Sequence, residues 1–317
     1  MGARCKREHC FVPDSPCLMG EDDPRSCGYW DKSESSSDES PLDADSSPLP
    51  WSSRSLGLAD LSYLASQSSL RVIAVVGPKN CGKTTFLASI YLLLQRGQLP
   101  TGFEFSRSYT IGGWENDAHY LRWNGSHTPS FPPHTTAREG RAPGLLHLGM
   151  RTPTSGIIDL AITDAPGEWF RRWAVDKNAA DSVGARWVAE NADQFVLMID
   201  CDVLSGSTRG EALLSYQLIA ERLASEAKKR PVHIVWSKSD VQVPHVTKAR
   251  LSERLERLFP ASAQSDISVK PVGEKHEVVE GNFVQVLGWM LDSGEARGTA
   301  VEFPERSEDS FLAFRTL

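Results

Sequence analysis

The stretch RVIAVVGPKNCGKTTF, residues 71–86, decides how this chain folds. Its first six residues, 71–76, are mainly apolar and β-branched, which is typical of a strand buried on both faces of a parallel sheet. Residues 83–95 have the pattern of a helix, which we expect to end before Gly97. Between them, residues 77–84 fit the pattern G-x-x-x-x-G-K-S/T. The sequence therefore predicts a strand, a glycine-rich turn and a helix in direct succession.

A turn of this kind, placed between a buried strand and a helix, binds phosphate groups. Gly77 and Gly82 let the backbone curl so that N–H groups point at an anion, and the helix adds its positive N-terminal end. Lys83 is expected to reach the β- and γ-phosphates of a nucleotide as a catalytic residue, and the Thr84 hydroxyl to bind Mg²⁺. The alternative is a glycine-rich turn without a ligand. The predicted nucleotide contacts are Gly77, Pro78, Lys79, Asn80, Cys81, Gly82, Lys83, Thr84 and Thr85.

A second motif, DAPGE at residues 164–168, follows the apolar strand predicted for residues 157–163. It is similar to the D-x-x-G element of nucleotide switches. Asp164 is then expected beside Mg²⁺, and the Gly167 N–H beside the γ-phosphate. The alternative is an ordinary strand-to-helix turn, since Asp, Pro and Gly all favour turns.

A third motif, SKSD at residues 237–240, follows the strand predicted for residues 233–236. It resembles the N/T-K-x-D motif that reads a guanine base. The Asp240 carboxylate would accept the N1–H and 2-amino groups of guanine, and the Lys238 stem would cover the ring. Adenine lacks this pair of donors. Ser237 replaces the usual Asn or Thr, a change that predicts weaker ties to the phosphate loop. The alternative is a solvated polar loop.

For nucleotide hydrolysis the sequence also offers candidates for a Mg²⁺-sensing threonine, a water-orienting residue and an arginine finger. The Mg²⁺-sensing threonine should precede the strand at residues 144–151, which makes Thr135 and Thr136 the candidates. Glu168 follows Gly167, at the position that orients the attacking water. A carboxylate there would repel the γ-phosphate unless it is protonated or paired, and its alternative role is to favour the start of the next helix. The candidates for an internal arginine finger are Arg138, Arg141, Arg171 and Arg172.

Strand-like and helix-like segments alternate from residue 56 onward, which indicates a mostly parallel sheet covered on both faces. In such sheets ligands bind at the carboxyl ends of the strands. The predicted strands are 71–76, 144–151, 157–163, 195–201, 233–236 and 267–271. The predicted helices are 57–67, 83–95, 211–229, 248–258 and 281–291, and residues 169–190 are expected to be helical in whole or in part. No fifth nucleotide motif is predicted near the last strand.

Composition narrows the class of protein. The 317 residues are 40% hydrophobic and carry a net charge of −7 without a dense basic block, so nucleic-acid binding is not expected. Neither a membrane span nor a secretory signal is apparent, which predicts a cytoplasmic protein. The expected organisation is a Cys-rich segment at 1–30, a disordered acidic Ser/Pro linker at 31–55, a nucleotide-binding domain at 56–295 with a long insertion at 98–135, and a tail at 296–317.

The N-terminal segment holds a cluster of four cysteines, Cys5, Cys10, Cys17 and Cys27. Four thiolates within a short segment of a reducing compartment suit tetrahedral Zn²⁺ and predict a zinc knuckle. The spacings are irregular and contain no C-x₂-C pair, so the alternative is a set of free cysteines.

Taken together, the three motifs resemble the TRAFAC class of P-loop GTPases with the Ras-like fold, a three-layer α/β sandwich. Lys83 and Asp164 are 81 positions apart (164 − 83), and the extra length includes FEFSRSYTIGGWENDAHYLRW at residues 103–123. That stretch and the Cys cluster look like the bacterial double-GTPase family, whose members are predicted to act in NTP-dependent conflict or defence systems.

The resemblance implies a regulatory switch that hydrolyses GTP to GDP and phosphate with Mg²⁺, with slow intrinsic turnover and an unknown protein effector or regulator. It implies no membrane partner, and it leaves the oligomeric state open. The alternatives are a P-loop ATPase or nucleotide kinase, and a nucleotide-binding scaffold with negligible hydrolysis.

Overall fold

The computed structural model describes residue 27 and residues 55–122, 130–132, 143–154, 156–270 and 276–292, with the backbone alone for 276–279. The chain divides into two units, Met1–Leu49 and Pro50–Leu317, and all helices and strands of the described residues belong to the second unit. The predicted linker at 31–55, apart from Ser55, and the tail at 296–317 lie outside the described residues. Within those residues no helix combines the length and the apolar character needed to cross a membrane.

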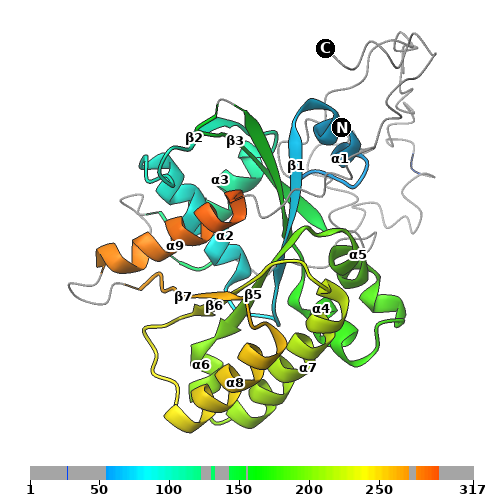
Figure 1. The fold of residues 1–317 in the computed structure, drawn as a ribbon, viewed down its shortest axis with the longest axis vertical. Coiled ribbons are helices and arrows are strands. Elements are labelled where there is room, and N and C mark those ends of the chain that lie inside the picture. The colour runs from blue at the N-terminus through cyan, green and yellow to red at the C-terminus, as the bar shows by residue number, and fades with distance from the viewer. Residues whose placement is uncertain are drawn as a thin grey trace, which may run out of the picture. The chain divides into compact units, whose positions relative to one another are not determined.

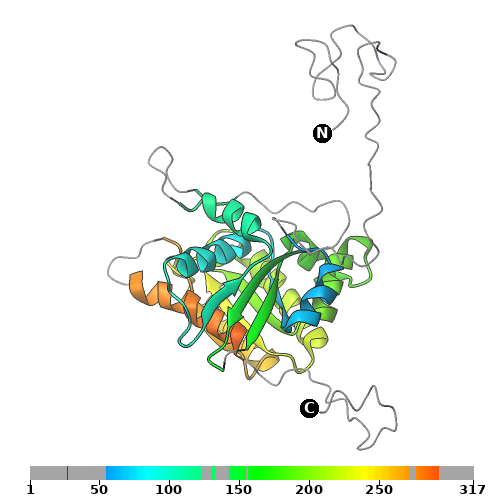
Figure 2. The same cartoon turned by 90° about the horizontal axis from the view of Figure 1, so that it is seen from above.

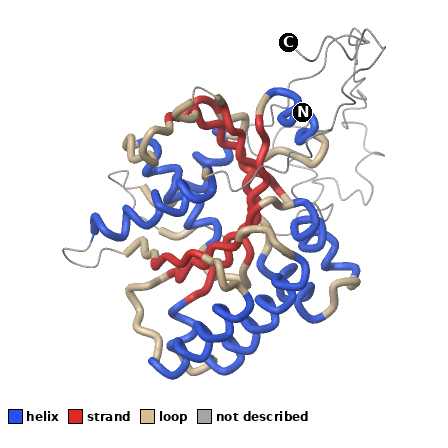
Figure 3. The backbone as a smooth tube through the Cα atoms, viewed as in Figure 1, coloured by secondary structure: helices blue, strands red, loops and turns tan. Residues whose placement is uncertain are grey.

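Seven strands form one sheet in the order β2-β3-β4-β1-β5-β6-β7, seen as a continuous red band in Figure 3. Strands β4, β1, β5, β6 and β7 run parallel, whereas β3 is antiparallel to both β2 and β4. The strands are β1 (Ser69–Val76), β2 (Glu104–Arg107), β3 (Gly144–Arg151), β4 (Ile157–Asp164), β5 (Gln194–Asp200), β6 (Val232–Ser237) and β7 (Ala263–Asp266).

Helices cover both faces of this sheet, which makes the fold the predicted three-layer sandwich (Figures 1 and 2). One face carries α4 (Gly167–Val175), α5 (Val183–Asn191), α7 (Arg209–Ala227) and α8 (His245–Leu258). The other face carries α2 (Lys83–Gln95), α3 (Ile111–His119) and α9 (His276–Leu291). The remaining helices are α1 (Asp60–Gln67), α6 (Cys201–Ser205) and a 3₁₀ turn at Ala180–Ser182.

Strand β1 is buried on both faces, as its unbroken apolar run predicts. Val72, Ala74 and Val76 pack into the core under α4, α5 and α7. Ile73 and Val75 point the other way, into the core under α2, α3 and α9. Each fully buried Ile or Val contributes about 1.5–3 kcal/mol relative to an exposed one. This burial fixes β1 at the centre of the sheet and, with it, the loop that follows.

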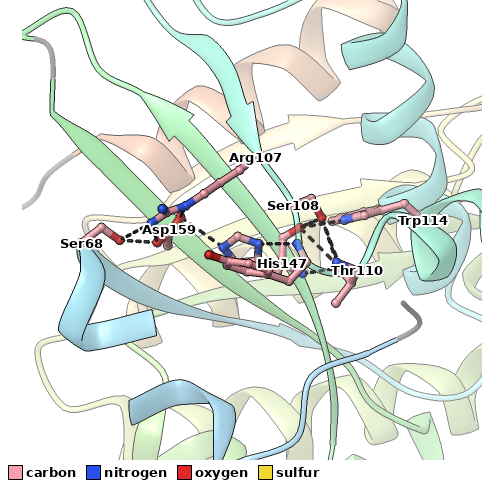
Figure 4. Close-up of polar contacts among 8 residues, drawn as sticks. Ser68, Arg107, Ser108, Thr110, Trp114, His147 and Asp159 are labelled. Atoms are coloured by element: carbon pink, nitrogen blue, oxygen red, sulfur yellow. Dashed lines mark hydrogen bonds and ion pairs between the residues drawn. The ribbon is translucent and has the colours of Figure 1, made fainter. Parts of the chain in front are cut away.

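The chain between α2 and β3 contributes β2 and α3, which are tied to the sheet by a buried polar network (Figure 4). Asp159 of β4 lies fully buried, with its Oδ2 2.6 Å from Nη2 of Arg107 on β2 and also accepting from the Ser68 hydroxyl. Its Oδ1 lies 3.1 Å from Nε2 of His147 on β3. The Tyr109 backbone N–H donates to Nδ1 of His147 at 3.0 Å. Since Nδ1 accepts, the proton of the neutral ring lies on Nε2, facing the carboxylate.

The main chain of His147 is held by the same segment. The Trp114 indole and the Ser108 hydroxyl both donate to the His147 carbonyl, at 2.9 and 2.6 Å. The His147 N–H in turn donates to Thr110 Oγ1 at 2.8 Å. The network therefore fastens β2, β3, β4 and the start of β1 to one another and fixes the register of the β3–β4 hairpin.

Charge on Asp159 is stabilised despite its burial. Burial alone would raise the pKa of this carboxyl, but the close contact with His147 and the hydrogen bonds from Arg107 and Ser68 outweigh it and hold the pKa well below the usual range. A carboxylate buried without such partners would cost several kcal/mol, so the three donors are needed together.

The structure corrects two expectations about secondary structure and refines a third. The last strand of the described residues is Ala263–Asp266, whose polar sequence AQSD gives no apolar signal, and residues 267–270 of the predicted strand 267–271 lie outside any strand. The segment 169–190, expected to be helical in whole or in part, forms α4 and α5 with a break after Val175, where Asp176 Oδ1 accepts from the Asn178 N–H at 2.9 Å and competes with the helix. The elements β2, α3 and α6 have no counterpart among the predicted strands and helices.

We expect Asp159→Asn to lower the free energy of unfolding by about 3 kcal/mol, because it leaves Arg107 and His147 facing a neutral amide in a buried site. Urea denaturation would measure the change. The matched control is Glu253→Gln, which removes the exposed pair of Glu253 with Arg257 at 3.6 Å and should cost under about 0.5 kcal/mol. Equal costs for the two variants would contradict this account of the network.

The same carboxylate predicts a pH dependence. Because the pKa of Asp159 is lower in the folded state, its contribution to stability is complete above the unfolded value of about 3.9 and is lost as the pH falls towards the folded value. The difference in unfolding free energy between wild type and Asp159→Asn should be constant from about pH 5 to 7 and shrink by about 1 kcal/mol at about pH 3. A difference that stays unchanged at the acidic end would show that Asp159 is not stabilised as an anion.

Candidate functional site

The segments that follow β1, β4, β5, β6 and β7 meet at the carboxyl edge of the parallel strands, where they line one cavity of about 320 Å³. The segment after β5 contributes Asp202 of helix α6, and the α9 helix and residues 131–132 complete the wall. The lining residues are Lys79, Asn80, Gly82, Lys83, Thr84, Thr85, Phe86, Phe131, Pro132, Ala165, Gly167, Glu168, Asp202, Ser237, Lys238, Asp240, Ile267, Ser268, Val269, Lys270 and Phe283. The structure thus brings all three sequence motifs to one place.

The loop after β1 has the backbone of an anion-binding turn. Asn80 and Gly82 adopt left-handed conformations, with φ of 66° and 91°, and α2 begins immediately afterwards at Lys83. The Lys83 ammonium is buried within the loop, where it donates to the carbonyls of Gly77 at 3.2 Å and Pro78 at 3.0 Å. A helix N-terminus and a buried cation at one point favour a phosphate ligand. Gly77, Pro78 and Cys81 belong to the loop but are not among the cavity-lining residues.

The two predicted Mg²⁺ ligands lie side by side. Thr84 Oγ1 is 3.2 Å from Oδ1 of Asp164, although the two residues are far apart in the chain. Hydroxyl and carboxylate oxygens are what Mg²⁺ prefers, and this ion usually keeps several waters and substrate phosphates in its shell. Among the described residues no cluster of three His, Cys, Asp or Glu side chains could hold a metal. Thr135 and Thr136 lie outside the described residues.

At the other end of the cavity Asp240 is held by the chain that follows β7. Its Oδ1 accepts from the Ser268 hydroxyl at 2.6 Å, and its Oδ2 lies 3.6 Å from Lys270 Nζ. Lys238 has a left-handed backbone, with φ of 54°, and its ammonium lies 2.6 Å from the buried carboxylate of Asp200. Both charged side chains of the SKSD motif are therefore fixed in position.

Ser237 retains the tie to the phosphate loop that its departure from Asn or Thr was expected to weaken. Its hydroxyl is buried and is within hydrogen-bonding distance of the carbonyl of Cys81, at 2.8 Å, and that of Ile199, at 3.1 Å. A single hydroxyl proton can serve only one carbonyl at a time, and the shorter contact favours Cys81. The SKSD loop and the loop after β1 are thus joined by one side-chain contact.

Among the site residues that sequence reasoning did not predict are Asp200, which holds Lys238, and the lining residues Ser268, Lys270 and Phe131. The first lies at the end of a predicted strand and could have been found by its position. Ser268 and Lys270 were hidden because the sequence predicts a strand over residues 267–271. Phe131 is 62% exposed at the cavity wall, and no motif marks it.

Glu168 is paired, as a carboxylate beside a phosphate site must be. Its Oε1 lies 2.9 Å from Nζ of Lys79 on the loop after β1. Burial alone would raise the pKa of Glu168, but the hydrogen bond and charge of Lys79 outweigh it, and the pKa is lowered. Glu168 is therefore an anion that lines the cavity.

The two described candidates for an arginine finger, Arg171 and Arg172, do not line the cavity. Arg172 is exposed and forms an ion pair with Asp181 at 2.9 Å. Arg138 and Arg141 lie outside the described residues.

The cysteines separate into two groups. Cys81 and Cys201 are buried free thiols, and burial raises the pKa of Cys201 to about 12 and that of Cys81 in the same direction. Both thiols are thus kept protonated. Of the N-terminal cluster, Cys27 is a buried free cysteine, while Cys5, Cys10 and Cys17 lie outside the described residues, so the zinc knuckle stays a prediction.

Comparison with known proteins gives one family match. Residues 71–289 match the family model described as DO-GTPase2, Double-GTPase 2. No curated protein matches. One similar solved structure is a crystal structure of Era in complex with MgGDPNP and nucleotides 1506–1542 of 16S ribosomal RNA, at 18% identity and a TM-score of 0.36. That match covers 77% of this chain and 61% of the Era chain.

We expect Gly167→Ala to destabilise the protein by about 1–3 kcal/mol, because a Cβ there would lie 2.2 Å from the Lys79 nitrogen and 2.3 Å from the Pro78 carbonyl carbon. Gly281→Ala is the matched control. It lies within α9 with nothing within 4 Å of the added Cβ, so it should stabilise the protein by about 0.5–1 kcal/mol. Thermal or urea unfolding measures both. A neutral Gly167→Ala would show that the two loops do not need this close approach.

Proposed function

The chain belongs to the Double-GTPase 2 family of P-loop GTPases, and from that premise we propose that it binds GTP in preference to ATP and hydrolyses it to GDP and phosphate with Mg²⁺. The observation that carries the proposal is the single cavity of about 320 Å³ with a phosphate-binding loop at one end and the Asp240 carboxylate at the other. A nucleoside triphosphate needs both a cationic end for its phosphates and a polar end for its base.

The proposed preference for guanine is supported by the contacts that position the Asp240 carboxylate. The Ser268 hydroxyl occupies Oδ1 at 2.6 Å and leaves the carboxylate further lone pairs for the two neighbouring N–H donors of guanine. Adenine offers no such pair of donors and would leave the carboxylate without compensation for the water it loses. Lys238, held by Asp200, supplies an aliphatic stem beside the base.

The phosphate end is supported by Lys83, Thr84 and Asp164. Lys83 would bind phosphate oxygens from within its loop, and the adjacent oxygens of Thr84 and Asp164 would hold Mg²⁺. When bound, that ion neutralises negative charge on the phosphate oxygens. Gly167 packs against the same loop, since a Cβ on it would lie 2.2 Å from the Lys79 nitrogen, and its N–H would bind the γ-phosphate.

Hydrolysis requires a water in line with the γ-phosphorus. We propose that the Glu168 carboxylate accepts a hydrogen bond from that water and so orients it. With only this group and the cations of the site, turnover is expected to be slow, on the order of the 10⁻⁴–10⁻² s⁻¹ of GTPases without an added partner residue. A regulatory role through a protein partner in a bacterial conflict system stays a prediction from the family resemblance.

Asp240→Asn tests the proposed base reading. We expect wild type to bind fluorescent GTP with Mg²⁺ at least about 100-fold more tightly than fluorescent ATP, because only guanine pairs with the carboxylate. In Asp240→Asn the preference should move to xanthosine triphosphate, whose base presents an acceptor where guanine presents its 2-amino group. Asp202→Asn is the control, because it also removes a carboxylate that lines the cavity. Asp202 lies 3.8 Å from the Lys238 ammonium and is not the proposed guanine acceptor, so this variant should keep the preference for GTP.

Two outcomes would contradict the proposal. Equal or tighter binding of ATP would make SKSD a polar loop and the protein a P-loop ATPase or nucleotide kinase. GTP binding without any turnover over hours would support a nucleotide-binding scaffold.

A further inference from the structure

The ion pair of Lys79 and Glu168 lies at the cavity wall, and its contribution to folding stability is too small to explain its position. The two side chains are 53% and 54% exposed, and an exposed ion pair of this kind contributes only about 0–1 kcal/mol. Yet the pair joins the loop after β1 to the loop after β4, at the point where their backbones touch. A Cβ on Gly167 would lie 2.2 Å from the Lys79 nitrogen, so the neighbouring Glu168 side chain starts beside that of Lys79. The geometry places a cation and an anion together at the cavity wall.

Lys79 differs from the other cations of the cavity. The described residues that line it include no arginine and four lysines, Lys79, Lys83, Lys238 and Lys270. Lys238 and Lys270 lie at the base end, 2.6 Å from Asp200 and 3.6 Å from Asp240. Lys83 is buried inside its loop. Lys79 is therefore the half-exposed cavity lysine beside Glu168 and Gly167, at the end of the cavity to which the proposed function assigns the phosphates.

We propose that Lys79 is an internal cationic finger, which leaves Glu168 when a triphosphate binds and pairs with an oxygen of its γ-phosphate, so that the freed Glu168 carboxylate receives the attacking water. This inference rests on the proposed hydrolysis of GTP. A flexible, half-exposed lysine suits the exchange, because its stem has four rotatable bonds and its partner Glu168 lines the cavity beside it.

The step is balanced without a further reactant. The water oxygen forms a bond to the γ-phosphorus while the bond from that phosphorus to the bridging oxygen breaks. GDP leaves with the electron pair of that bond, and a proton of the water passes to a phosphate oxygen. Lys79 stabilises the charge on the γ-phosphate oxygens during this exchange, and it returns to Glu168 once phosphate has left.

The exchange explains how a carboxylate can work beside a phosphate. With Lys79 on Glu168, the Glu168 carboxylate is neutralised at the cavity wall. With Lys79 on the γ-phosphate, the ammonium neutralises part of the phosphate charge and so reduces the repulsion between that phosphate and the freed Glu168 carboxylate. GDP has no γ-phosphate, so the exchange responds to the triphosphate alone.

Lys79→Met and Lys79→Arg test the proposal in the full-length chain. We expect Lys79→Met to lower the single-turnover rate of GTP hydrolysis about 100-fold or more, and Lys79→Arg to recover most of that loss. Lys79→Met should weaken the binding of the triphosphate more than that of GDP. The affinity for the imido analogue of GTP should fall about tenfold while that for GDP changes less than about twofold, since the contact is made only to the γ-phosphate.

A double variant tests whether the two residues act together. Lys79→Met with Glu168→Gln should be no slower than the slower single variant, because residues that act as one unit are not additive. Lys177→Met is the matched control. It removes an equally exposed lysine, paired with Glu226 at 3.4 Å away from the cavity, and should leave hydrolysis unchanged.

Each remaining outcome decides against the inference in a distinct way. If wild type and Lys79→Met hydrolyse GTP at the same rate, the role of Lys79 as a finger is overturned and the proposed function stays intact. Equal weakening of GDP and the GTP analogue would make Lys79 a general phosphate contact. A wild type that does not hydrolyse GTP at all refutes the proposed hydrolysis, and the finger with it. Urea unfolding of each variant confirms that the comparison is between folded proteins.

Discussion

Parallel pairing of β1 with β4 and β5 is the constraint on which the rest of the structure depends. Because these strands run the same way, the loops after them open at one edge, and β6 and β7 extend that edge. The burial of β1 on both faces prevents it from sliding relative to its neighbours, since a shift of one residue would exchange the two cores. Thr84 and Asp164 are consequently brought within 3.2 Å of each other, and Ser237 within 2.8 Å of the Cys81 carbonyl.

The ion pairs of the cavity follow from the same arrangement. They join side chains from different loops or from the end of a neighbouring strand, as Glu168 is joined to Lys79 and Lys238 to Asp200. Away from the cavity, the network around Asp159 performs a purely structural task, since the His147 ring and the Asp159 carboxylate are both occupied within the fold. The protein thus uses buried charge to fix the register of its hairpin, and both buried and half-exposed charge at its cavity.

The sequence was informative wherever a short motif met an apolar strand. Helix α2 and strand β3 have the predicted bounds. The motif residues converge as expected, because the parallel strands β1, β4 and β6 that precede them have a strong apolar signal. The signal failed at β7, whose four residues are polar, and the error hid Ser268 and Lys270 in a strand that does not exist. It also failed at β2, a short edge strand with few apolar residues. Phe131 was missed as a site residue because no motif includes it. Contacts such as those of Lys79 with Glu168 depend on how two loops meet, which no local pattern encodes.

The central claim is that one cavity holds a guanine nucleotide from its γ-phosphate to its base. A crystal structure with Mg²⁺ and the imido analogue of GTP tests it most directly. We expect the guanine edge on the Asp240 carboxylate, the phosphates within the loop after β1, Mg²⁺ at Thr84 and Asp164, and the Lys79 ammonium on the γ-phosphate. A nucleotide bound with its base away from Asp240, or with its phosphates outside that loop, would contradict the claim.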